Sequence, residues 1–121
     1  MKICPVVDDS PTVRLMIRRM LEPLPFAVVE ASDGRAALDL CRKELPDAVL
    51  LDWNMPVMDG LAFLTALRRL PDGSRPVVIF CTTVNELAHI EEALDAGADE
   101  YVMKPFEEEI VHAKFRQTGL L

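Results

Sequence analysis

The sequence VVDDS, residues 6–10, places two adjacent carboxylates directly after an apolar run. A short run of this kind, rich in Val and Ile, is typical of a buried β-strand. Asp8 and Asp9 therefore stand at a strand end, where Ser or Gly would have introduced no charge. Because two neighbouring carboxylates repel each other, we expect this pair to face a positively charged partner.

Four more apolar runs follow, separated by segments with helical spacing. The five predicted strands are residues 3–7, 26–29, 48–51, 77–81 and 101–103. The first helix is expected to begin with Ser10 as its N-cap and Pro11 in its first turn. Its predicted buried stripe comprises Val13, Met16, Ile17, Met20 and Leu21. The other four predicted helices are residues 33–44, 59–70, 85–96 and 107–117.

Strict alternation of strands and helices indicates the α/β class, with a doubly wound parallel sheet. Consecutive parallel strands need right-handed crossovers, which place helices on both faces of the sheet. The strands lack polar alternation, as expected for strands that are covered on both sides. We find no repeat or linker, and the 121 residues are predicted to form a single domain, residues 1–121.

Composition excludes several classes of function. Thirteen basic and 20 acidic side chains give a formal charge of −7, which argues against nucleic acid as a partner. No apolar run approaches the roughly 20 residues that span a bilayer, and the N-terminus does not resemble a signal peptide. We therefore expect a cytoplasmic protein with no membrane partner. The three cysteines form no C-x-x-C pair and are predicted to be reduced, buried thiols.

The polar residues at the strand ends suggest a site. In a doubly wound sheet, ligands bind beyond the carboxyl ends of the strands. The residues that follow or end the predicted strands there are Asp8, Asp9, Asp52, Thr82 and Lys104. At about 4 Å and an effective dielectric near 20, each pair of carboxylates costs on the order of 4 kcal/mol before screening. Mg²⁺ would remove this cost, because carboxylate and carbonyl oxygens are its preferred ligands.

The same set of groups fits phosphoryl transfer. An aspartate can accept a phosphoryl group as an acyl phosphate, and Asp52 stands alone on its strand, whereas Asp8 and Asp9 form a pair suited to a metal. A cation, the ammonium of Lys104 and the hydroxyl of Thr82 supply the charge neutralisation that the reaction needs. Asp52 is therefore the predicted nucleophile.

These residues resemble the receiver domain of bacterial two-component response regulators. The segments VVDDS, LLDWNMPVMDG and AGADEYVMKPF, with Thr82 between them, carry the resemblance, and it covers the whole chain. The segment DWNMPVMDGL is similar to the stand-alone chemotaxis regulators. The resemblance implies a flavodoxin-like fold, with strand order 2-1-3-4-5 and five helices.

The resemblance also implies roles for individual residues. Asp52 would receive a phosphoryl group from a sensor histidine kinase or a histidine phosphotransfer protein, with Thr82 and Lys104 binding the phosphoryl oxygens. The implied Mg²⁺ ligands are Asp8, Asp9, Asp52 and the backbone carbonyl of Asn54, with Asp8 often acting through water. Pro105 would follow a cis peptide bond.

Tyr101 resembles the switch aromatic of the family. Movement of Thr82 toward the phosphoryl group would let the ring turn inward and alter the surface of helix four, strand five and helix five, which would bind a downstream protein. Such a protein is a signalling switch that catalyses only its own phosphorylation and dephosphorylation. A monomer is expected, and dimerisation on phosphorylation, the kinase, the target and the pathway (chemotaxis or a phosphorelay) stay open.

Several residues depart from the pattern or admit another interpretation. Thr83 is branched where many members have a smaller residue, and Val84 is apolar at a position that affects access of water to the acyl phosphate, so the phosphoryl lifetime is open. His89 and His112 are predicted to be solvated surface residues. Two rival functions remain: a phosphohydrolase of the haloacid dehalogenase type, which places D-x-D near its start and usually has a cap, and a phosphorylation-independent adaptor.

Overall fold

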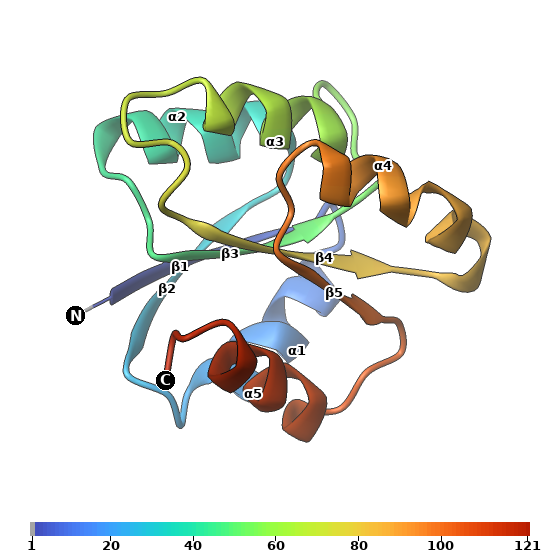
Figure 1. The fold of residues 1–121 in the computed structure, drawn as a ribbon. Helices are drawn as coiled ribbons and strands as arrows, with labels where there is room; N and C mark the ends of the chain where they lie inside the picture. The colour runs from blue at the N-terminus through green and yellow to red at the C-terminus, as the bar shows by residue number, and fades with distance from the viewer. Residues whose placement is uncertain (1) are drawn as a thin grey trace.

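The computed structural model describes residues 2–121, which form a five-stranded parallel sheet between two layers of helices (Figure 1). The strand order is β2-β1-β3-β4-β5, so the predicted fold and strand order are confirmed. The strands are β1 (Lys2–Val7), β2 (Phe26–Ala31), β3 (Ala48–Asp52), β4 (Val77–Thr82) and β5 (Glu100–Met103). The helices are α1 (Pro11–Leu21), α2 (Gly34–Lys43), α3 (Gly60–Arg68), α4 (Ile90–Asp95) and α5 (Glu108–Gln117), with a 3₁₀ segment η1 (Val84–His89) before α4.

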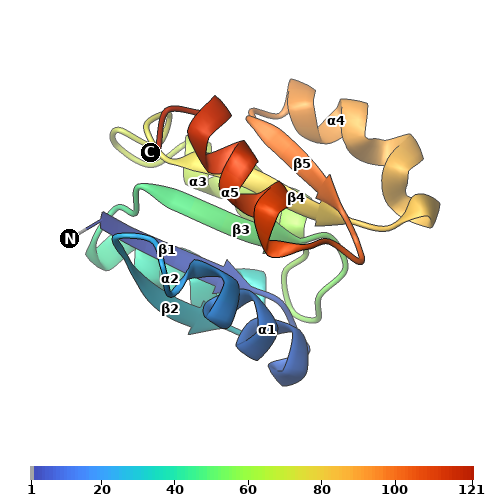
Figure 2. The same cartoon turned by 90° about the horizontal axis from the view of Figure 1, so that it is seen from below.

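The helices cover both faces of the sheet, as the connection rule requires. Helices α1 and α5 lie on one face and α2, α3 and α4 on the other (Figures 1 and 2). Each face has its own apolar core. The first packs Phe26 and Phe115 edge to face with ring centroids 5.2 Å apart, and the second is centred on the fully buried Phe63 and Phe80.

Side-chain caps fix where most helices begin. The side chains of Ser10, Asp33 and Asp59 accept hydrogen bonds from the backbone N–H groups of Val13, Ala36 and Ala62. Each cap satisfies a donor that the first helical turn leaves free. The predicted start of the first helix at Ser10 and Pro11 is therefore confirmed, and the second and third helices begin one residue after their capping aspartates.

Two predictions about the helices are wrong. The single helix predicted for residues 85–96 is instead η1 followed by α4, because no side chain of Val84–His89 is buried to stabilise an α-helical turn there. Met16, predicted to lie in the buried stripe of α1, is 53% exposed. The stripe of α1 is therefore narrower than its spacing indicates, with Ile17 and Leu21 fully buried.

Candidate functional site

The carboxyl ends of the strands bring three aspartates together. Asp8 follows β1, Asp9 comes next, and Asp52 ends β3. Oxygen atoms of these three carboxylates lie within 4.8 Å of one another, although Asp8 and Asp52 are buried and Asp9 is exposed. Residues that are more than 40 positions apart in the sequence thus form one acidic pocket, as the strand-end argument predicts.

Lys104 provides the ammonium of this pocket. It follows β5, and its Nζ lies 2.9 Å from Asp52 Oδ1 and 3.1 Å from Asp8 Oδ2. Burial alone would lower the pKa of Lys104, but its hydrogen bond to Asp52 and the charges of Asp52 and Asp8 outweigh burial and raise that pKa. The lysine is therefore held firmly in its charged form.

The pocket keeps an excess of negative charge. Burial raises the pKa of Asp52, the Lys104 hydrogen bond lowers it, and the nearby Asp8 raises it again, so the pKa stays above its usual value. Three carboxylates facing one ammonium are the donor set for a hard divalent cation. On this observation the pocket fits Mg²⁺, with Asp8, Asp9 and Asp52 as the side chains able to hold it.

Local backbone contacts fix the position of Asp8. Its Oδ1 accepts a hydrogen bond of 2.9 Å from the backbone N–H of Ser10, and its backbone carbonyl accepts one of 2.6 Å from Arg14. The backbone N–H of Asp8 donates to Ala31 at the end of β2. The carboxylate is therefore held from its own loop, from α1 and from the neighbouring strand.

A glycine allows α3 to start directly behind Asp52. A Cβ at Gly60 would lie 2.3 Å from the backbone carbonyl oxygen of Asp52, so only glycine fits without movement of the backbone. The N–H of Gly60 donates to the carbonyl of Trp53 at 2.9 Å, which closes the loop that carries Asn54. Strand β3 before Asp52 and the close approach of Gly60 after it thus fix the position of Asp52 within the segment LLDWNMPVMDG.

The loop after β4 lies opposite this segment. Thr82 is fully buried, and its hydroxyl donates to the carbonyl of Thr83 at 3.3 Å. Glu86 accepts hydrogen bonds from the N–H and hydroxyl of Thr83 through one carboxylate oxygen and from the side-chain amide of Asn54 through the other. Glu86 therefore links the two loops, a role that its position in the sequence did not reveal.

The remaining predicted site residues lie around β5. Tyr101 is half-buried against the second core, and Lys114 Nζ lies 6.0 Å from the centre of its ring. The Lys104–Pro105 peptide bond is cis, as the resemblance implies. The role of Tyr101 as a switch and the carbonyl of Asn54 as a metal ligand stay predictions.

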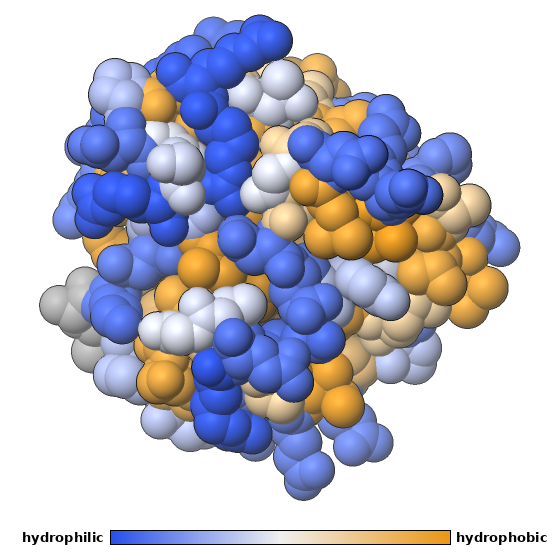
Figure 3. Space-filling view, viewed as in Figure 1, coloured by the Kyte–Doolittle hydropathy of each residue, from blue (hydrophilic) through white to orange (hydrophobic). Residues whose placement is uncertain are grey.

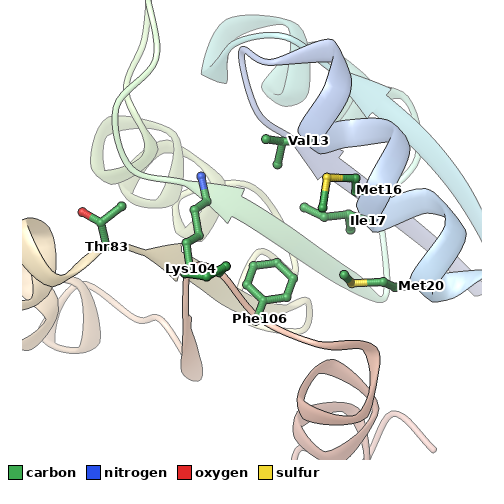
Figure 4. A pocket seen from close by; sticks show the side chains of 8 residues that line it. Val13, Met16, Ile17, Met20, Thr83, Lys104 and Phe106 are labelled. Carbon is green, nitrogen blue, oxygen red and sulfur yellow. The ribbon is translucent and has the colours of Figure 1, made fainter.

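An apolar groove opens beside the acidic pocket. It has a volume of about 350 Å³ and separates α1 from the segment after β5. Figure 4 shows the amine of Lys104 between Thr83 and the side chains of α1. The groove is lined by Val13, Met16, Ile17, Met20, Thr83, Lys104, Pro105 and Phe106. The exposed Met16, which the sequence placed in the core, belongs to this groove.

The histidines and cysteines lie outside the pocket. His89 is exposed as predicted, and its ring stacks at 6.0 Å on that of Trp53. The prediction for His112 is wrong, because this residue is half-buried with Nε2 2.8 Å from the carbonyl oxygen of Met20. All three cysteines are free and buried, and burial raises the pKa of Cys4 and Cys81 to about 12. The thiols are packing groups, as expected.

Comparison with known proteins agrees with this geometry. The family model of the response regulator receiver domain matches residues 5–116. The chain belongs to this family. Receiver domains are signalling switches of two-component systems. Response regulator MprA of Mycolicibacterium vanbaalenii is 42% identical over 111 residues, which make up 92% of this chain and 47% of that relative. The chain thus spans about half the length of this curated relative.

Two solved structures of receiver domains are similar along nearly the whole chain. The chemotaxis protein CheY4 of Vibrio cholerae has a TM-score of 0.89 at 31% identity, with 97% of this chain and 98% of that chain covered. The receiver domain of the sensor histidine kinase PA1611 from Pseudomonas aeruginosa has a TM-score of 0.87 at 28% identity, with 96% and 95% covered. In that structure a magnesium ion is coordinated in the active site cleft. Within residues 2–121, no helix of our protein is long and apolar enough to cross a membrane.

Proposed function

We propose that this receiver domain accepts a phosphoryl group on Asp52 in a Mg²⁺-dependent reaction and transmits the change to the surface of α4, β5 and α5. The observation that carries the proposal is the acidic pocket. Three carboxylates lie within 4.8 Å, with the ammonium of Lys104 2.9 Å from Asp52. The magnesium ion in the active site cleft of PA1611 and the carboxylate cluster of this chain support Asp8, Asp9 and Asp52 as ligands, and the resemblance adds the carbonyl of Asn54.

Asp52 is suited to be the nucleophile. A carboxylate oxygen of Asp52 forms a bond to phosphorus while the P–N bond of a donor phosphohistidine breaks, and the imidazole leaves with the electron pair and takes up a proton from solvent. Bound Mg²⁺ would neutralise charge on the phosphoryl oxygens. Lys104, whose raised pKa keeps it charged, would release its hydrogen bond to Asp52 and bind a phosphoryl oxygen.

The donor has a route to Asp52. The apolar groove beside α1 ends at Lys104, so a histidine on a partner that packs against Met16 and Phe106 would approach the pocket from this side (Figure 4). A sensor histidine kinase or a histidine phosphotransfer protein is the proposed donor. Its apolar contacts would fill the groove, and its phosphohistidine would reach the ammonium.

Thr82 and Tyr101 are the proposed relay to the surface. The hydroxyl of Thr82 donates to its neighbour Thr83 in the present conformation, so it is free to exchange this bond for one to a phosphoryl oxygen. Movement of Thr82 would leave space that the ring of Tyr101 can fill, shifting the equilibrium between two states of the β5 surface. A Tyr101 rotamer that stays unchanged with a phosphoryl analogue would contradict this relay.

The proposal is tested with phosphoramidate, a small donor that contains a P–N bond. We expect one phosphoryl group per wild-type chain in the presence of Mg²⁺, measured by intact-protein mass spectrometry, and none in Asp52→Asn. The matched control is Asp59→Asn, which removes a carboxylate from the same loop region and keeps an N-cap side chain. An equal level of phosphorylation in Asp52→Asn and wild type would place the acceptor elsewhere.

Turnover separates this proposal from its phosphohydrolase rival. A switch carries the phosphoryl group on itself, whereas a phosphohydrolase releases phosphate from a substrate in many cycles. Incubation with p-nitrophenyl phosphate and Mg²⁺ should therefore give no more colour than the Asp52→Asn variant. Sustained release of p-nitrophenol by the wild type alone would favour the phosphohydrolase.

A further inference from the structure

A second apolar groove lies at the other side of β5. It has a volume of about 570 Å³ and runs between the edge strand β5 and helix α5. Its lining residues are Tyr101, Val102, Met103, Pro105, Phe106, Glu107, Ile110 and Lys114. Ile110 is 48% exposed and contributes apolar surface to this groove. We call the exposed surface of α4, β5 and α5 the output face.

Most of the net charge of the chain lies in its C-terminal segment, residues 84–121, which contains α4, β5 and α5. Residues 84–121 carry nine acidic and three basic side chains, whereas residues 1–83 carry eleven acidic and ten basic ones. The formal charges of the two segments are therefore −6 and −1. Figure 3, which views the molecule from the side of α4, β5 and α5, shows apolar patches next to strongly hydrophilic side chains.

Most of these acidic groups have no cation of their own. Asp99 pairs with Arg68 at 3.1 Å and Glu100 with Lys114 at 3.3 Å, so the one lysine that lines the groove is already neutralised. Within residues 84–121, six exposed acidic residues form no ion pair with any residue of the described range 2–121. They are Glu91, Glu92, Asp95, Glu107, Glu108 and Glu109.

Helix stabilisation accounts for only part of this set. Glu91 and Glu92 lie in the first turn of α4, and the first turn of α5 likewise contains two glutamates, where negative charge is favourable. Asp95 is the last residue of α4, where negative charge is unfavourable. Glu107 is the N-cap of α5 but makes no capping hydrogen bond, and it lines the groove. The charge of Asp95 therefore does not stabilise its helix, and the Glu107 carboxylate, although favourably placed against the helix dipole, makes no capping hydrogen bond and faces the groove.

We infer that the output face binds a basic amphipathic segment of a partner protein, whose apolar side chain enters the groove beside Ile110 and whose Lys or Arg residues face the surrounding acids. The inference rests on the proposed function, because it names the chemistry of the partner that the switched surface binds. Charge complementarity selects this occupant. A second copy of the chain would bring two acidic faces together, and nucleic acid would be repelled.

The partner chemistry is tested first with a displayed library of random dodecapeptides. The library is selected on the full chain with Mg²⁺ and beryllofluoride, which is the phosphoryl analogue. We expect the enriched pool to carry a net positive charge together with at least one large apolar residue. A pool that is acidic or neutral, or no enrichment over empty beads, would overturn the inference.

The most enriched peptide is then synthesised with a fluorescent label, and its affinity is measured by anisotropy. Glu107→Lys should weaken binding by about two- to fivefold, the range of a single exposed ion pair, and Ile110→Ala by at least about fivefold if its side chain is a contact anchor. The matched control Glu44→Lys makes the same charge change at the exposed C-cap of α2, which lies outside the output face. It should leave the affinity unchanged. Equal losses for Glu44→Lys and Glu107→Lys would contradict the location.

Salt and a separate probe of the pocket complete the test. Raising the NaCl concentration should lower the affinity of the peptide, because its contacts with the output face are between exposed charges. Trp53, the single tryptophan, directly follows Asp52 in the sequence, so we expect its fluorescence to change when Mg²⁺ and beryllofluoride bind. If Trp53 responds but no basic peptides are selected, only the inference about the partner is refuted. If Trp53 does not respond at all, the proposed function is refuted. Beryllofluoride-induced dimerisation through the output face, seen by light scattering, would also overturn the inference.

Discussion

Two half-buried cations, Arg68 and Lys104, each connect several segments of this molecule, and their surroundings differ. Arg68 donates to the carbonyl oxygens of Gly97, Gly73 and Pro76 and to the carboxylate of Asp99, at distances between 2.7 and 3.1 Å. Every contact of Arg68 is with a neutral acceptor or a single counter-charge. This network satisfies the loops that precede β4 and β5.

Lys104 sits in a pocket whose charges are not balanced. Its one positive charge faces Asp8 and Asp52 directly, and Asp9 adds a third carboxylate nearby. The Arg68 network is complete within the chain, whereas the Lys104 pocket lacks one or two positive charges. A polar network whose groups are all paired stabilises the fold, whereas a pocket with unbalanced charge marks a place where a ligand can supply the missing charge.

Removal of the Arg68 guanidinium should have the largest effect on the free energy of unfolding. Arg68→Ala leaves three carbonyl groups without their side-chain donor and Asp99 without its counter-charge, and we expect the free energy of unfolding to fall by about 3 kcal/mol. Urea denaturation measures the loss. The neighbouring Arg69, which is exposed and forms no ion pair within residues 2–121, gives the control Arg69→Ala, expected to change stability by under about 0.5 kcal/mol. Equal losses in both variants would remove the contrast.

Mg²⁺ should stabilise the protein through the acidic pocket around Lys104 and independently of the Arg68 network. At a tenfold excess over its dissociation constant, binding to the folded state alone raises the free energy of unfolding by about 1.4 kcal/mol. Thermal unfolding with and without the metal measures this rise. Asp9→Ala should abolish it, and both Arg68→Ala and the exposed-site control Asp39→Ala should retain it. The assignment fails if Asp9→Ala and wild type respond equally.

Neutralising Asp52 should stabilise the metal-free protein. Because its pKa is raised in the folded state, ionisation of Asp52 opposes folding, and this cost is fully present above its folded pKa. We therefore expect the free energy of unfolding of Asp52→Asn, measured by urea denaturation, to exceed that of the wild type at neutral pH. The gain in stability should disappear as the pH falls below about 4, the pKa of Asp52 in the unfolded state, because Asp52 is then protonated in both states. A variant less stable than wild type at neutral pH would show that Lys104 already balances the pocket.

The smallest effect is expected at a surface ion pair. Burial works against ionisation of Glu30, but hydrogen bonds from Arg14 and Arg18, each 3.0 Å long, hold its pKa below the usual value. Glu30→Gln should therefore cost less than about 0.5 kcal/mol at neutral pH in low salt. The difference should vanish as the pH falls through the folded pKa of Glu30, and also in high salt. A loss as large as that of Arg68→Ala would mean that exposure does not weaken this pair.

Much of the fold follows from local signals. Each predicted strand lies within an observed one, and the caps at Ser10, Asp33 and Asp59 fix helix starts through contacts with residues three positions away. The acids at the ends of β1 and β3 converge because parallel strands place their carboxyl ends at one edge. Signals of this kind can be read in the sequence since the interacting groups are close along the chain or share a strand end.

The rest depends on contacts between distant segments. Arg68 meets the carbonyl of Gly97 and Glu86 meets Asn54, and no local pattern links either pair. Ring stacking of His89 on Trp53 and the contact of His112 with Met20 are also long-range. The break between η1 and α4 arises because the residues of η1 find no buried position, which the helical spacing of their apolar side chains does not reveal. Contacts of this kind form only when the sheet brings distant segments together, so they could not be predicted from the sequence.

The most direct test of the acidic pocket locates the phosphoryl group chemically. The protein is treated with phosphoramidate and Mg²⁺, reduced with borohydride, which converts an acyl phosphate to the alcohol, and digested for peptide mass spectrometry. The account predicts reduction at residue 52 only, and none when EDTA replaces Mg²⁺. Reduction at Asp8 or Asp9, or at residue 52 to the same extent without the metal, would contradict it.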